Sequence, residues 1–144
     1  LEIRVIENDD MHELHAAVEK NITKADVLFV PYGSLFLDYH RGLGAVCEEA
    51  KRPFFSCHDW TVRNSAALGY AMSFMPLGEQ AAELAMRIIF NGERASEIPF
   101  TPFPSNWHPM INTTIAQDQG LDSAALEKRV ASEKDIEICS GRVC

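Results

Sequence analysis

The chain has 144 residues, 47% of them hydrophobic, which suits one modest domain or part of a larger one. Its net charge of -8, without any cluster of Lys or Arg, argues against a surface for nucleic acid or an anionic membrane, because both require concentrated positive charge. No apolar run approaches the roughly 20 residues of a membrane span, so the sequence predicts a soluble protein. The chain also begins without Met and inside an apparent strand, so it looks excised from a longer protein.

Strands and helices alternate through the first half of the chain. Residues 1–7 alternate in polarity and are rich in Ile and Val, so we expect a strand there. Asp10 and Glu13 have the spacing of a capping box, which predicts a helix start. The apolar residues that follow at helical spacing are Met11, Leu14, Val18 and Ile22. Residues 25–31 form a continuous apolar run, which is typical of a strand covered on both faces in a parallel sheet.

A second helix and two further strands follow. The apolar residues that mark the helix are Leu43, Val46, Cys47 and Ala50, and Pro53 follows its expected end. Residues 53–57 are interpreted as a third strand, residues 61–69 as a short helix or turn, and residues 70–75 as a fourth strand. This alternation predicts an α/β fold with a doubly wound, mainly parallel sheet and right-handed crossovers.

The second half begins with a long amphipathic helix at residues 77–90. Its apolar stripe consists of Ala81, Leu84, Ala85, Ile88 and Ile89. Asn91 and Gly92 suit the left-handed turn that closes a helix, and Pro99 can start a strand at residues 98–103. Residues 102–109 hold three prolines and predict a rigid crossing segment rather than a regular element. A turn within residues 111–121 and a surface helix from about Asp122 or Ser123 complete the chain.

The cysteines do not form a recognisable framework. The four residues are Cys47, Cys57, Cys139 and Cys144, too few and too irregularly spaced for a disulfide scaffold or a zinc site. We interpret Cys47 as a core residue. Cys139 and Cys144 could close a small loop in an oxidising compartment or could be free thiols. The chain also has no phosphate loop, no G-x-G-x-x-G and no metal-ligand constellation, so we expect neither a cofactor nor a metal.

Two patterns in the second half carry a family resemblance. The helix-and-strand pattern consists of Gly78, Ala81, Ala82, Ile88, Gly92, Ile98 and Pro99. The ending I-N-x-x-x-A-x-x-x-G-L consists of Ile111, Asn112, Ala116, Gly120 and Leu121. Both resemble the C-terminal part of ABC-transporter substrate-binding proteins of the type I periplasmic-binding-protein group, in the branch linked to uptake of tryptophan and related amino acids. The chain departs from that family at Phe74, Met75 and Pro76, where an acidic residue and small residues usually stand.

The resemblance implies a two-lobed protein. Residues 1–68 and 105–144 would form the C-terminal ligand-binding lobe, and residues 69–104 would belong to the N-terminal lobe, most of which is absent from this sequence. Hinges would lie near residues 59–70 and 102–109. The apolar stripe of the helix at residues 77–90 would then face solvent, so we expect either a homodimer of this fragment or a piece cut from a larger parent.

Ligands of open parallel sheets bind outside the carboxyl ends of the strands. The candidate ligand-binding residues at these ends are Tyr32, Gly33, Ser34, His58, Asp59, Trp60 and Met75. Gly33 and Ser34 could offer backbone donors and a hydroxyl at a helix start, where the partial positive charge favours a carboxylate. Tyr32 and Trp60 could stack on an apolar or aromatic group. The Tyr-Gly-Ser sequence is equally compatible with an ordinary strand-to-helix turn.

Several histidines invite other interpretations. His58 beside Asp59 could be a catalytic base with its orienting acid, but adjacent residues at a strand end usually point apart and the chain has no nucleophile elbow. A polar loop at the edge of a cleft is the favoured interpretation. His12 and His15 have the spacing of a metal pair on a helix, yet a third ligand is missing, which favours a solvated helix face.

The proline-rich crossing holds two further candidates. Trp107 and His108 could be core anchors or could line the cleft.

The sequence therefore predicts a binding module rather than an enzyme. The leading hypothesis is a periplasmic or otherwise extracytoplasmic receptor that closes on a small ligand such as an amino acid and delivers it to an ABC permease. The ligand carboxylate would lie near Gly33 and Ser34, with its apolar part against Tyr32 or Trp60. The alternatives are a small α/β enzyme that uses His58 and Asp59, and a ligand-sensing domain of a signalling protein.

Overall fold

The computed structural model describes residues 1–7, 10–72, 74–100, 102, 107–131, 133 and 135–141, and the side chains of residues 34–37 are outside this description. The described chain divides into two compact units. Unit 1 comprises Leu1–Ala71 and His108–Cys144, and unit 2 comprises Met72–Trp107. Among the described residues, no helix combines the length and the apolar composition needed to cross a membrane.

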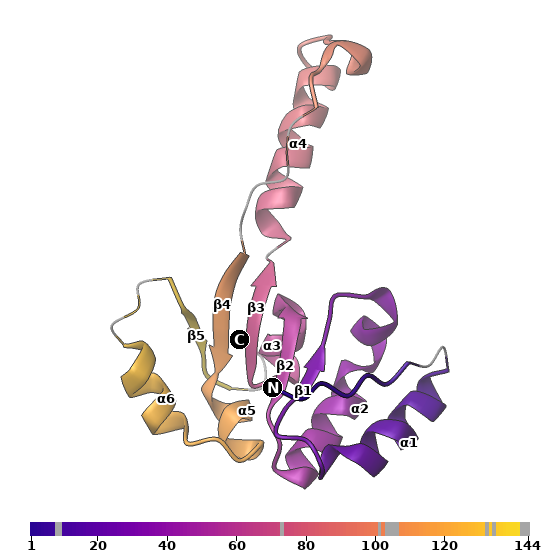
Figure 1. Ribbon diagram of the computed structural model, residues 1–144. Coiled ribbons are helices and arrows are strands. Elements are labelled where there is room, and N and C mark those ends of the chain that lie inside the picture. The colour runs from indigo at the N-terminus through magenta and orange to yellow at the C-terminus, as the bar shows by residue number, and fades with distance from the viewer. Residues whose placement is uncertain are drawn as a thin grey trace. The chain divides into compact units, whose positions relative to one another are not determined.

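Unit 1 is built on a five-stranded sheet with the strand order β1-β2-β3-β4-β5 (Figure 1). Its strands are β1 (Leu28–Val30), β2 (Phe54–His58), β3 (Leu68–Met72), β4 (Trp107–Asn112) and β5 (Glu137–Cys139). Its helices are α1 (Met11–Ile22), α2 (Ser34–Ala50), α3 (Asp59–Asn64), α5 (Thr113–Asp118) and α6 (Ser123–Val130). Unit 2 contains α4 (Met75–Ile89) and the short 3-10 helix η1 (Ala95–Glu97).

The sheet is mainly parallel. β1 pairs in parallel with β2, with Val30 opposite Ser56, and β4 pairs in parallel with β5. The arrows of β3 and β4 point in opposite directions (Figure 1). In agreement, the N–H of Asn112 at the end of β4 donates to the carbonyl of Ala67, just before β3. The predicted α/β class with a mainly parallel sheet is confirmed.

The core of unit 1 lies between α1, α2, α3 and the sheet. Its buried apolar side chains include Leu14, Val18 and Ile22 of α1, Leu43, Val46 and Cys47 of α2, Phe54 of β2 and Val62 of α3. The residues of α1 and α2 in this list belong to the apolar stripes that the sequence of the first half predicts. Cys47 is fully buried, as expected, and burial raises the pKa of its thiol to about 12. Asp10 caps α1 by accepting hydrogen bonds from the N–H groups of His12 and Glu13.

Three predictions of strands were wrong or shifted. Residues 1–7 form no strand, and their Leu1, Ile3 and Val5 side chains are exposed, because a strand needs a partner edge and the sequence pattern does not supply one. Residues 98–100 follow η1 without joining a sheet, for the same reason. The fourth strand lies at residues 68–72 rather than 70–75.

Strands β4 and β5 were not predicted. The proline-rich segment that suggested a crossing contains the start of β4 at Trp107, and Pro109 lies inside that strand. The short β5 follows α6 and pairs with β4, with Ile111 opposite Ile138. A proline inside a strand and a strand of only three residues are both hard to predict from sequence. Pairing with neighbouring strands stabilises β4 and β5 despite these weak local signals. The predicted last helix is confirmed, with Asp122 as its N-cap.

Helix α4 in unit 2 is amphipathic but carries no buried residue. Ile89 and Phe90 are each 71% exposed, and Met86 and Ile88 are exposed as well. Gly92 adopts a positive φ of 69°, as predicted for the turn that follows the helix. The side chain of Gln80 donates to the carbonyl of Pro102, and Arg87 pairs with Glu93, so the segment after α4 folds back along it. The exposure expected for the apolar stripe is therefore observed.

Candidate ligand-binding site

The carboxyl ends of β1 and β2 meet at one edge of the sheet because the two strands are parallel neighbours. A shallow depression opens there, with a cavity volume of only about 10 Å³, or about 220 Å³ of empty space when its open mouth is included. Its lining residues are Val30, Pro31, Gly33, Phe54, Ser56, His58 and Thr61. Three short stretches of the chain thus converge on it: the end of β1, strand β2 and the start of α3. This is the position at which ligands of open α/β sheets bind.

His58 is the central polar residue of this pocket. It ends β2, precedes α3 as its N-cap, and is only 8% exposed. The Tyr32 ring stacks on the imidazole, with ring centroids 5.6 Å apart and an angle of 24° between the planes. His58 Nδ1 lies 3.6 Å from Asp59 Oδ1, which is longer than a hydrogen bond. Burial lowers the pKa of His58, and the negative charge of Asp59 opposes this only in part.

A second histidine of unit 1 is also buried. His40 is on α2, is 5% exposed, and its Nδ1 lies 2.6 Å from Ser65 Oγ. Burial lowers the pKa of His40, and the charges of Arg41 and His58 lower it further, against the opposing effect of Asp38. Both imidazoles are therefore held in their neutral forms near neutral pH.

The start of α2 forms another wall of the pocket. Gly33 is the N-cap of this 17-residue helix, no side chain caps it, and its first turn holds no acidic residue. The φ of Gly33 is -176°, which is extended backbone that any residue can adopt. The first backbone N–H groups of a helix lack partners within the helix and carry partial positive charge. This end of α2 therefore favours an anionic group.

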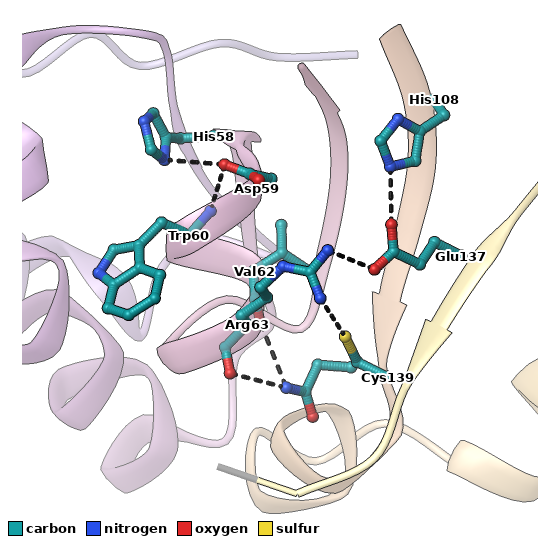
Figure 2. A network of polar contacts seen from close by, with 9 residues as sticks. His58, Asp59, Trp60, Val62, Arg63, His108, Glu137 and Cys139 are labelled. Carbon is teal, nitrogen blue, oxygen red and sulfur yellow. Dashed lines mark hydrogen bonds and ion pairs between the residues drawn. The ribbon is translucent and has the colours of Figure 1, made fainter. Parts of the chain in front are cut away.

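Helix α3 is held in place at both ends (Figure 2). At its start, the backbone N–H of Trp60 donates to Asp59 Oδ1 over 2.7 Å. At its end, Arg63 forms an ion pair with Glu137 of β5, and Glu137 also contacts His108 Nε2 at 2.9 Å. Asn112 Nδ2 donates to the carbonyls of Val62 and Arg63 at 3.3 and 3.1 Å, respectively. The pocket wall formed by α3 is thus tied to β4 and β5.

The structure brings together some of the predicted site residues. Gly33 and His58 line the pocket, Tyr32 stacks on His58, and Asp59 lies beside it. Trp60 follows on α3 and is 49% exposed. Ser34 starts α2, and its side chain is outside the described part of the chain. Met75 starts α4 in unit 2, is exposed, and is not one of the residues that line the pocket.

Ser56 and Thr61 were missed as pocket residues. Ser56 is two positions before His58 on β2, and the alternating burial of that strand places both on the same buried face. A polar residue at this spacing from His58 was the available signal. Thr61 could be found only from the fold, since it depends on where α3 turns away from the sheet.

His15 and His108 contact other side chains. The His15 imidazole lies 3.2 Å from Glu19 and packs edge-on against Tyr39, so it is less solvated than predicted. The described residues hold no cluster of three or more His, Cys, Asp or Glu side chains suited to a metal. His108 pairs with Glu137, while Trp107 is 40% exposed and is not a core anchor. Cys139 is disulfide-bonded, so of the two alternatives expected for it, a disulfide or a free thiol, the disulfide holds. Cys144, the partner that the sequence suggested, lies outside the described residues.

Comparison with known proteins decides the family. A model of the ABC transporter substrate binding protein family matches residues 1–133, which is most of the chain. The chain belongs to this family. The resemblance predicted from the two sequence patterns is therefore confirmed.

The chain is also similar to individual proteins and solved structures. The chain is 28% identical over 89 residues to a tyrosine-binding protein of Clostridioides difficile, a match that covers 62% of this chain and 26% of that protein. It is similar to the L-Trp complex of an ABC domain from Streptococcus pneumonia, with a TM-score of 0.67 and 18% identity over 87% of this chain and 41% of that one.

A third likeness is to the ligand-free, open structure of a Clostridium difficile substrate-binding protein with adhesive properties. Its TM-score is 0.59, with 22% identity over 90% of this chain and 41% of that one. The chain thus spans well under half the length of these relatives. At these identities the solved structures show a shared fold.

The fold gives structural roles to the residues of the I-N-x-x-x-A-x-x-x-G-L pattern. Asn112 caps α5 by accepting the N–H of Ile115, and its amide group binds the end of α3. Gly120 has a φ of 88°, which favours glycine, and the N–H of Leu121 donates to the carbonyl of Ala116. These residues close helix α5 and brace the sheet, so their role is structural.

Proposed function

We propose that this chain is part of a solute-binding receptor of an ABC uptake system, and that it binds a small carboxylate-bearing molecule such as an amino acid. The observation that carries the proposal is the pocket where the uncapped start of α2 meets the buried His58 and the ring of Tyr32. Fixed backbone dipoles suit a carboxylate, and the aromatic rings suit an apolar side chain. The tyrosine- and tryptophan-binding relatives support an aromatic amino acid as the first ligand to test.

The carboxylate would bind near the backbone of Gly33 and Ser34, with the apolar part of the ligand against Tyr32 or Trp60. The acidic net charge does not oppose this, because exposed charges are screened beyond about 10 Å, whereas dipoles at a helix start act at short range. His58 and Asp59 would shape the pocket beside the ligand. Met75, which starts α4 in unit 2, stays a predicted ligand-binding residue.

Isothermal titration calorimetry with all common amino acids tests the proposal. We expect binding of one or a few of them, and the Trp60→Ala variant should bind more weakly by about 1–3 kcal/mol if the indole stacks on the ligand. Ile89→Ala on α4 is a matched control, because Ile89 is also exposed and apolar but lies in the other unit. Absence of binding across the panel contradicts the function, and an unchanged Trp60→Ala variant contradicts the role of Trp60.

The enzyme alternative rests on His58 and Asp59. Because the chain belongs to a family of substrate binding proteins, binding without turnover is the better proposal. Product analysis after prolonged incubation with the bound amino acid distinguishes the two functions. Release of unchanged ligand supports a receptor, and stoichiometry above one turnover supports the enzyme. A sensing role would be distinguished by a signalling module in the full-length protein.

We further propose the partners and the compartment. The receptor would deliver its ligand to an ABC permease on the extracytoplasmic side of the membrane, where the disulfide of Cys139 is stable. Residues 69–104, which include α4, would belong to the N-terminal lobe of the complete receptor. In this chain on its own, the exposed face of α4 would associate with a second copy.

A further inference from the structure

The pocket at the ends of β1 and β2 has one ionisable side chain among the described residues that line it. His58 is that residue, and the others are apolar, glycine, or hydroxyl-bearing. Because His58 is 8% exposed and lies under the Tyr32 ring, solvent screens its charge only weakly. The charge of the pocket wall therefore depends on whether this imidazole carries a proton.

Its surroundings favour the neutral imidazole in the empty pocket. Burial lowers the pKa of His58, and the positive end of α2 at Gly33 lies on the same pocket. The buried His40 of α2 is close enough that the charge of His58 lowers the pKa of His40. Asp59 is the opposing charge, at 3.6 Å, but its Oδ1 already accepts the Trp60 N–H.

A bound anion changes this balance. A ligand carboxylate at the start of α2 would neutralise the positive end of the helix and place a negative charge in the pocket that His58 lines. Opposite charges within a few ångströms favour the ionised form of both groups, most strongly in a site shielded from water. Binding of the carboxylate and protonation of the imidazole then stabilise one another.

We propose that His58 is a proton-linked specificity residue, whose imidazole becomes more fully protonated from solvent when a carboxylate ligand binds, so that such ligands bind more tightly in mild acid. This inference rests on the proposed function of the same pocket. It assigns His58 a role in selecting anionic ligands and it predicts that uptake is favoured where the medium is acidified. No bond forms or breaks other than the N–H bond of the imidazolium.

Calorimetric titration with L-tyrosine and with L-tryptophan at about pH 7.5 and about pH 5.5 tests the inference. The dissociation constant of the whole chain should fall about three- to tenfold at the lower pH, which corresponds to a rise of up to one unit in the pKa of His58 on binding. Titrations in two buffers of different ionisation enthalpy should show net proton uptake. His58→Gln should lose both the pH dependence and the uptake, and His12→Gln, on the exposed surface of α1, should keep them.

The outcomes separate the inference from the proposed function on which it rests. Binding of either amino acid with equal affinity at both pH values and without proton uptake overturns the inference and leaves the receptor function standing. Absence of binding of both amino acids overturns the inference, and failure of the wider amino-acid panel overturns the receptor function too. If His58→Gln does not fold, NMR titration of the His58 imidazole in the unmodified chain replaces it. A pKa that does not rise on saturation with ligand contradicts the inference.

Discussion

Helices α2 and α4 both carry clear apolar stripes, yet the fold buries one and leaves the other exposed. Leu43 and Cys47 of α2 are almost completely inaccessible, whereas α4 has no buried residue and Ile89 is 71% exposed. Helix α2 connects the parallel strands β1 and β2, so the crossover itself lays it against the sheet. Helix α4 lies in unit 2, away from such a crossover. An amphipathic pattern therefore specifies a helix and the face that needs cover, but not what covers it.

The same contrast holds for polar side chains. In unit 1, the buried Gln119 accepts the Phe54 N–H and donates to the Ser65 carbonyl, and Asn112 is fully buried and bonded. In unit 2, the Arg87–Glu93 pair is half-buried. Buried hydrogen bonds are costly to break, whereas exposed ion pairs contribute little. Unit 1 is thus expected to carry most of the folding stability. Of the four experiments below, the first compares the two units directly, the next two compare sites and conditions within unit 1, and the last tests the exposed face of unit 2.

The largest effect should come from the core of unit 1. Phe54 is fully buried on β2, so Phe54→Ala should lower the free energy of unfolding by about 3–5 kcal/mol through lost burial and a cavity. Phe90→Ala at the end of α4 removes the same ring from a position that is 71% exposed, and should change it by less than about 0.5 kcal/mol. Urea unfolding followed by circular dichroism measures both. Similar losses for the two variants would contradict the contrast between the units.

A smaller effect is expected at the helix caps. Asn112→Ala removes the cap of α5 and the bonds to the end of α3, and should destabilise by about 2–3 kcal/mol because buried carbonyls lose their donor. Asp122→Ala removes only the exposed cap of α6 and should cost about 1 kcal/mol. The same urea titrations compare them. Equal costs would mean that Asn112 acts only as a cap.

The pH dependence of stability should also originate in unit 1. Burial holds the pKa values of His40 and His58 below 6.5, so between these lowered values and about 6.5 the unfolded chain binds protons more readily than the folded one. Stability should therefore be fully present above about pH 6.5 and should decrease as the pH falls below it. Urea midpoints at about pH 8 and about pH 5.5 measure the loss. An unchanged midpoint would show that neither imidazole is held neutral by the fold.

The smallest change in folding stability is expected for Ile89→Glu on α4, within about 0.5 kcal/mol, because this side chain is exposed. Self-association should nevertheless weaken, because a charge would interrupt the apolar face. Sedimentation velocity over a range of concentrations measures it, with Glu79→Gln on the same helix as the control. A chain that is monomeric at every concentration would contradict the proposed association of α4.

Part of the site was predictable because strand ends of a parallel sheet share an edge. The sequence placed Tyr32, Gly33 and His58 at such ends, and the fold brings them to one pocket. The contact between Tyr32 and His58, the proximity of His40, and the contribution of Thr61 could not be predicted. They depend on the register of β1 against β2 and on the directions in which α2 and α3 leave the sheet.

The sequence by itself determined the helices α1, α2, α4 and α6, because a period of 3.6 and capping residues such as Asp10 are local signals. It did not determine α5, since residues 113–118 were expected to form a turn, and it left a short helix or turn near α3. It also determined the α/β class and the family, through the alternation of elements and the turn residues that close them. Tertiary structure alone decided which extended segments become strands. Residues 1–7 have the better strand composition and remain unpaired, while the proline-containing β4 lies inside the sheet. A strand is stabilised by hydrogen bonds to a neighbour that is distant in sequence, so its own residues cannot specify it.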